Sequence, residues 1–202
     1  MSALDDKARL KELYLPPTND FVFVDVPDMQ FVMIDGEGSS DGEAFKHGMK
    51  WIFAVVYPLK RLAKERMGAD FVEAPIEVLW WADDMSDFIA GNKDVWKWRL
   101  MIVTADWVDS GMFEQAVATV RERLGEPPES LRLDRYAEGR CVQIMHRGPE
   151  NEEGAAVARR LYGEFLPQHG LTPSGHFHEI YLTDPSRVAP EKMRTVLRQP
   201  VR

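Results

Sequence analysis

Residues 21–40, with the sequence FVFVDVPDMQFVMIDGEGSS, predict the structural unit on which the rest of the fold is built. Two runs of β-forming residues flank a Pro-Asp pair that is typical of a turn, and a loop rich in glycine and serine follows them. Beyond the loop, apolar residues recur in steps of three and four, which predicts a helix. In order, the sequence predicts a strand at 21–26, a turn at 27–28, a strand at 30–35, a helix at 45–63 and a strand at 71–81.

The second half of the chain repeats this order of hairpin, glycine loop, helix and strand. The expected elements are a strand at 131–136, a turn at 137–139, a strand at 140–146, a helix at 152–168 and a strand at 175–183. Gly170 stands where a glycine commonly ends a helix. We therefore expect a single domain over residues 1–202, with internal repeat halves of about 18–105 and 129–184.

The segment between the halves contains an acidic loop at 83–94, a strand at 96–104 and a helix at 110–124. Hairpins joined to single helices predict an α+β fold, in which an antiparallel sheet carries helices on one face. We expect two such modules to pack about a pseudo-twofold axis. The ligand cleft is then expected between the two halves.

A proline interrupts the first long helix of this scheme. Pro58 lacks the N–H that would bond to the Ala54 carbonyl, so it is expected to kink the helix or to end it. Two interpretations remain open for its neighbour Tyr57: the helix simply ends here, or a bend directs Tyr57 into the cleft.

Composition and charge exclude several classes of protein. The 202 residues carry 25 basic and 33 acidic side chains, for a formal net charge of −8, whereas nucleic-acid binding needs a basic face. The single cysteine, Cys141, forms no internal disulfide, which fits a reducing cytoplasm. Residues 1–13 lack an apolar signal segment, and no apolar run reaches the length of a membrane span. We therefore expect a cytoplasmic protein that contacts neither nucleic acid nor membrane directly.

The last predicted strand carries the strongest candidate for chemistry. Period-two alternation places Phe177, Glu179 and Tyr181 on one face, and the opposite face carries His176, His178, Ile180 and Leu182. If the first face lines the cleft, Glu179 is a partly desolvated acid that either binds a cation or acts as a general base. The alternative is a solvated strand face on which the glutamate is incidental.

Metal, cofactor and covalent chemistry find no complete motif. His176 and His178 have a spacing compatible with metal binding, but Cys141 and His146 fall on opposite faces of their own strand and supply no third ligand. The Gly-Glu-Gly loop lacks the Lys-Ser/Thr of a P-loop, and no Gly-x-Ser-x-Gly sequence is present. We expect no metal and no cofactor.

Tryptophans gather on two predicted strands that only a loop separates. Trp80 and Trp81 point to opposite faces of one strand, and Trp96 and Trp98 share a face of the other. These rings either form core or build a stacking wall for a flat ligand. Met101 lies on the opposite face from Trp98 and belongs to a different layer.

These features together resemble the GyrI-like small-molecule-binding proteins, which consist of two tandem SHS2 modules. The resemblance covers nearly the whole chain, from residue 11 to residue 201. Its most specific segments are 79–81 (LWW), 96–98 (WKW), 141–149 (CVQIMHRGP), 178–182 (HEIYL) and the tail at 184–192. The resemblance implies a pocket between the halves with Glu179 at its base, as in the effector-binding domains of multidrug-responsive activators. The chain departs from those regulators because it contains no helix-turn-helix region, so we do not expect it to control transcription directly.

Some stand-alone members of this family hydrolyse cyclopropane-bearing compounds that alkylate DNA, so the resemblance also implies a detoxifying hydrolase. In that hypothesis Glu179 is the general base, Tyr57 or Tyr181 holds the water or donates to the substrate, and Trp80 and Trp98 sandwich its ring system. The residues expected to contact the ligand are Trp80, Trp81, Trp98, Met101, His146 and Phe177.

Two alternatives remain open beside the hydrolase. The first is a non-catalytic module that sequesters lipophilic cationic drugs. The second is a protein-interaction role, as in the family member that inhibits DNA gyrase. In either small-molecule hypothesis the partner is an aromatic or lipophilic ligand, and the sequence predicts no oligomeric state.

Overall fold

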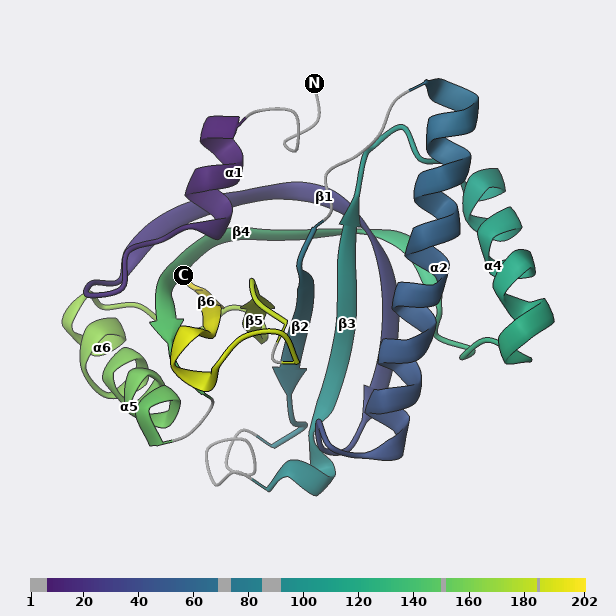
Figure 1. The fold of residues 1–202 in the computed structure, drawn as a ribbon. Helices are drawn as coiled ribbons and strands as arrows, with labels where there is room; N and C mark the ends of the chain where they lie inside the picture. The colour runs from purple at the N-terminus through teal and green to yellow at the C-terminus, as the bar shows by residue number, and fades with distance from the viewer. Residues whose placement is uncertain (1–6, 69–73, 85–91, 150–151, 185) are drawn as a thin grey trace. The chain divides into compact units, whose positions relative to one another are not determined.

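The computed structural model describes residues 7–68, 74–84, 92–149, 152–184 and 186–202 (Figure 1). These residues form two compact units. Unit 1 contains residues 29–136, and unit 2 contains residues 7–28 and 137–202 of the described chain. No helix within the described ranges combines the length and the apolar character that a membrane span requires.

Unit 1 is an antiparallel sheet of three strands in the order β1-β3-β2, with two helices. Its elements are the second part of β1 (Val22–Glu37), α2 (Glu43–Met67), β2 (Ile76–Trp81), the 3-10 turn η1 (Lys93–Val95), β3 (Lys97–Thr104) and α4 (Ser110–Leu124). Asp109 caps α4, because its side chain accepts a hydrogen bond from the Met112 N–H. In Figure 1, α2 and α4 lie side by side, and α2 also contacts β3.

Unit 2 has a second antiparallel sheet, with its strands in the order β4-β6-β5. Its elements are α1 (Lys7–Tyr14), the first part of β1, the second part of β4 (Arg132–Arg147), α5 (Glu152–Arg160), the π-helical turn η2 (Leu161–Phe165), α6 (Leu166–Gln168), β5 (Phe177–Tyr181), the 3-10 turn η3 (Pro190–Lys192) and β6 (Arg194–Pro200). A hydrophobic core of Val142, Leu161, Leu166 and Val201 joins the helical segment to the sheet.

The antiparallel α+β class predicted from the sequence is confirmed. The helices expected at 110–124 and 152–168 are present, the second with a π-helical turn in its middle. Gly170 follows that helix with φ +63°, the left-handed conformation that glycine adopts most easily.

The two predicted turns are wrong. Each pair of predicted strands forms one unbroken strand, and Pro27-Asp28 and residues 137–139 lie inside β1 and β4 (Figure 1). Within unit 1, β1 pairs with β3 from Gln30 onward, and within unit 2, β4 pairs with β6 from Cys141 onward. The misread residues are thus where the chain passes from one unit to the other. Proline is tolerated in a strand where its missing N–H is not needed, and a glycine such as Gly139, at φ +71°, lets a strand bend.

One further interpretation is wrong, two elements were missed, and two expected segments are described only in part. Pro58 does not end α2, which continues to Met67. The sequence analysis missed α1 and β6, although β6 is the central strand of the sheet in unit 2. Parts of the strand expected at 71–81 and of the acidic loop at 83–94 lie outside the described residues.

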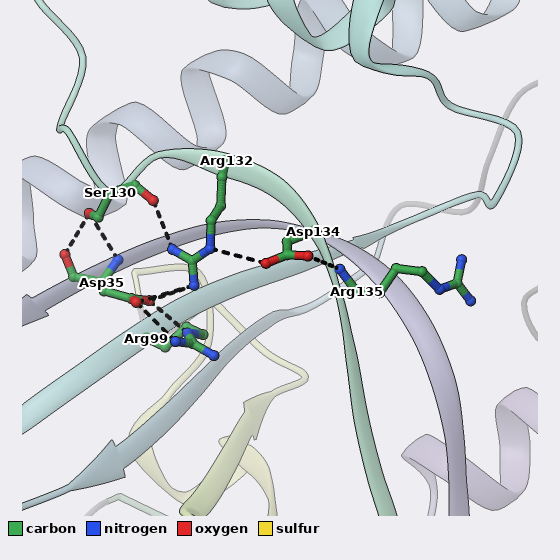
Figure 2. A network of polar contacts seen from close by, with 6 residues as sticks. All are labelled: Asp35, Arg99, Ser130, Arg132, Asp134 and Arg135. Atoms are coloured by element: carbon green, nitrogen blue, oxygen red, sulfur yellow. Dashed lines mark hydrogen bonds and ion pairs between the residues drawn. The ribbon is translucent and has the colours of Figure 1, made fainter.

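A polar network attaches the start of β4 to the sheet of unit 1 (Figure 2). The Asp35 carboxylate on β1 accepts hydrogen bonds from Arg99 Nε at 2.6 Å and from Arg132 Nη2 at 3.1 Å. The Ser130 hydroxyl donates to the Asp35 carbonyl at 2.8 Å. Burial raises the pKa of the Asp35 carboxyl, but the hydrogen bonds and charges of the two arginines outweigh it and leave this pKa below its usual value.

Candidate functional site

The strand β5 presents a hydrogen-bonded acid and phenol on one face. Exposure alternates along Phe177–Tyr181, so that Phe177, Glu179 and Tyr181 are half-buried while His178 and Ile180 are buried, as period two predicted. The Tyr181 hydroxyl donates to Glu179 Oε2 at 2.5 Å. This bond orients the carboxylate, and an ionised carboxylate that is held in place can accept a proton from a donor.

The opposite face of the same sheet carries a group of polar side chains, each at most 2% exposed, that we call the buried cluster: Glu138, Gln143, His178 and Arg198. Glu138 Oε1 lies 2.9 Å from His178 Nδ1, and Glu138 Oε2 accepts from Arg198 Nη1 at 2.9 Å. Arg198 Nε donates to Gln143 Oε1 at 3.0 Å. Because an ionised carboxylate can only accept hydrogen bonds, His178 Nδ1 carries the proton and donates to Glu138 Oε1.

The buried cluster alters the acid–base behaviour of its members. Desolvation raises the pKa of Glu138, but the charges and hydrogen bonds of His178 and Arg198 outweigh it and lower this pKa to about 2. Desolvation and the negative Glu138 raise the pKa of the nearby Cys141 thiol far above its usual value. Cys141 is therefore no thiolate nucleophile.

The helix α1 is bonded to the buried cluster through its last residues. Arg198 Nη2 donates to the Leu13 carbonyl at 2.5 Å, and Gln143 Nε2 donates to the Glu12 carbonyl at 2.8 Å. These donors satisfy carbonyls that a helix leaves without partners at its C-terminal end, where a positive charge is also favourable.

Sequence reasoning missed most of this cluster. Glu138 was assigned to a turn, and Arg198 lay in a tail to which no element was assigned. The available sign of a strand was the content of β-forming residues, Thr195 and Val196, within a run of alternating side chains. In that run, Thr195, Leu197 and Gln199 alternate with Val196 and Arg198. Nothing in the sequence indicates that Glu138, His178 and Arg198 meet. Along the chain, Glu138 is 40 residues from His178 and 60 residues from Arg198.

The tryptophans of unit 1 lie in a packed aromatic group. Trp80 and Trp98 face each other across β2 and β3 and are 4% and 1% exposed. Phe45, from the first turn of α2, stacks on Trp80 with ring centroids 5.4 Å apart and meets Trp98 edge-on at 5.2 Å. Phe45 therefore covers a ring face of Trp80 and contacts Trp98, the two rings between which the sequence analysis expected a flat ligand. This arrangement matches the core interpretation that was left open.

The remaining expected site residues are placed as follows. Trp81 is half-buried, and Met101 is fully buried on the face of β3 opposite to Trp98. His146 is 6% exposed, with Nε2 at 3.2 Å from the Pro149 carbonyl oxygen. Tyr57 is 62% exposed on α2. Among the described residues, no group of three or more His, Cys, Asp or Glu side chains is placed to hold a metal ion.

The chain is a member of a known protein family. Residues 19–202 match the family of the GyrI-like small molecule binding domain, and the chain belongs to it. This domain is therefore a small-molecule-binding domain. No similar protein was found among the curated proteins.

Solved structures from Listeria innocua resemble the chain over nearly its full length. An uncharacterized conserved protein shares 34% identity, with a TM-score of 0.82, over 97% of this chain and 98% of its own. A protein described as a hydrolase shares 33% identity, with a TM-score of 0.79, over the same fractions. The C-terminal domain of EcmrR is 12% identical, with a TM-score of 0.58 over 91% of this chain and 97% of its own, and shares the fold.

Proposed function

We propose that this GyrI-like protein is a detoxifying hydrolase that opens the cyclopropane ring of DNA-alkylating compounds. The hydrogen-bonded pair of Glu179 and Tyr181 on the half-buried face of β5 is the observation that carries the proposal. Its position on the strand agrees with a pocket glutamate, and the similar Listeria innocua protein described as a hydrolase supports an enzymatic role.

The proposed reaction needs a base and an oxyanion donor. Glu179 takes a proton from water while the water oxygen forms a bond to a cyclopropane carbon of a spirocyclopropyl dienone. The ring C–C bond breaks, its electron pair moves through the dienone to the oxygen, and a phenolate forms that solvent then protonates. Tyr181 orients the Glu179 carboxylate, and Tyr57 is the proposed donor to the developing oxyanion; each role contributes about 10²-fold or more.

Aromatic side chains are the proposed contacts of the flat substrate. Phe177 and Trp81 are half-buried and are the first of these proposed contacts. Trp80 and Trp98 lie on the other face of β2 and β3 from Trp81, packed against Phe45 of α2, so they are left out of this set. His146 is the remaining proposed contact, whereas Met101 is fully buried and is left out of the set.

The decisive experiment is chromatography of a cyclopropyl dienone alkylator incubated with the wild type and with Glu179→Gln. We expect the ring-opened hydrate with the wild type only, because the amide keeps the shape of the side chain but accepts no proton. Glu164→Gln, an exposed glutamate of unit 2, is the matched control and should keep full turnover. Hydrate formation by Glu179→Gln at the wild-type rate would exclude Glu179 as the base.

The same samples test the non-catalytic alternative. If the wild type forms no hydrate, fluorescence titration with a lipophilic cationic dye follows. A sequestering module would bind the dye, and Glu179→Gln would weaken that binding while leaving a neutral ligand unaffected.

A further inference from the structure

The buried cluster joins the three strands of the sheet in unit 2, one of which, β5, carries the candidate site. Glu138 lies on β4, Arg198 on β6 and His178 on β5, in a sheet whose order is β4-β6-β5. The Glu138 side chain, on β4, thus contacts Arg198 on the central strand β6 and His178 on the far strand β5. All three charged side chains are at most 2% exposed.

Stability alone is a weak reason for such a cluster. Removing charges from water costs several kcal/mol per ion, and well-packed apolar residues often replace a buried ion pair at no loss of stability. Ion pairs and hydrogen bonds add geometric specificity, because each of these contacts forms only when the strands lie in one relative position. The cluster therefore suits a role in positioning.

The element that it positions is β5. His178 is the direct neighbour of Glu179, and alternation turns the two side chains to opposite faces of the strand. A slide or twist of β5 that breaks the His178–Glu138 contact therefore also displaces Glu179 and its partner Tyr181. A displacement of about 1 Å at a catalytic group can cost about 100-fold in rate.

We infer that His178, with Glu138 and Arg198 behind it, is a positioning residue that holds the Glu179–Tyr181 pair in its reactive geometry. The inference rests on the proposed function for its effect on turnover. It assigns no contact between His178 and the substrate.

The test compares His178→Ala with His178→Asn, since the asparagine amide occupies the position of Nδ1 and still donates to Glu138. In the cyclopropyl dienone assay we expect kcat to fall about 10- to 100-fold in His178→Ala with KM within about twofold of the wild type. His178→Asn should recover most of this loss. Asp35→Asn is the control, because it removes a carboxylate from two arginines in unit 1 and changes no residue of the buried cluster.

Amide-hydrogen exchange at Glu179 and Tyr181 is measured in the same variants, well below each unfolding midpoint. We expect faster exchange in His178→Ala, recovery in His178→Asn and no change in Asp35→Asn. If the wild type forms no hydrate but exchange follows this pattern, the hydrolase proposal fails and the positioning role stands. Unchanged exchange in His178→Ala, or an His178→Asn variant as impaired as His178→Ala, would overturn the inference.

Discussion

Trp98 fits into unit 1 because the residues nearest to its ring have no side chains. Gly36 is its direct partner across β1 and β3, and Gly48 approaches it from α2. A Cβ atom at Gly36 would lie 2.3 Å from Cζ2 of the indole, and one at Gly48 would lie 2.9 Å from Cδ1 of Leu100. Close approach of a strand and a helix to one large ring explains both glycines.

At this scale Gly36→Ala and Gly48→Ala should differ. Gly36→Ala meets a rigid ring that has no room to move, so we expect the free energy of unfolding to fall by about 1–3 kcal/mol. Gly48→Ala meets the flexible end of Leu100 at 2.9 Å and the Trp98 ring at 3.2 Å, and it gains up to about 1 kcal/mol of helix propensity, so we expect a smaller loss than in Gly36→Ala. Urea denaturation of both variants measures the contrast, and equal losses would contradict it.

At the scale of elements, the strands and helices continue through residues that commonly interrupt them. The two long strands pass through Pro27 and Gly139, and α2 passes through Pro58. A proline or glycine acts on its own turn of backbone, whereas pairing and packing act along the whole element. The nine buried residues of α2, before and after Pro58, show how this helix is held: Phe45, Gly48, Trp51, Ile52, Val55, Val56, Leu59, Leu62 and Ala63.

We expect Pro58→Ala to stabilise the protein. The alanine restores the N–H that can bond to the Ala54 carbonyl and removes the clash of the proline ring, for a gain of about 1–3 kcal/mol. Thermal unfolding followed by far-UV circular dichroism measures this gain. A lower midpoint in Pro58→Ala would mean that the surrounding packing requires the proline.

At the scale of the whole molecule, acid stability depends on the buried cluster. Glu138 has a pKa of about 2 in the folded chain, against 4.5 as its usual value, so the unfolded chain binds more protons between these pH values. The shift contributes on the order of 3 kcal/mol at neutral pH. This contribution is complete above about pH 5 and is lost as the pH falls towards 2.

Glu138→Gln should therefore be less stable than the wild type at pH 7, by an amount that shrinks as the pH falls. Urea unfolding of both proteins at pH 7, 5, 4 and 3 measures this difference. His178 and Arg198 stay in both proteins, so the pH-dependent part of the difference reports the Glu138 carboxyl together with its coupling to these two side chains. A difference that stays constant across this range would show that Glu138 is not coupled to folding in this way.

Sequence patterns predicted much of what is local. The helices at α4 and α5–α6, the strand β3 and the alternation along β5 all follow from residue periodicity, because each depends on side chains a few positions apart. The missed elements, α1 and β6, have weaker local patterns. Their places depend on partners elsewhere in unit 2, such as the bond from Arg198 to the Leu13 carbonyl.

The sequence by itself determined the α+β class, the family and the face of β5 that carries Glu179 and Tyr181. Only the tertiary structure decided that Glu138 is a buried ion, that β1 and β4 run through their expected turns and that Phe45 covers Trp80 and Trp98. The physical reason is that periodicity reports which face of an element a side chain occupies. Burial, charge pairing and strand continuity depend on which distant segments pack against that face.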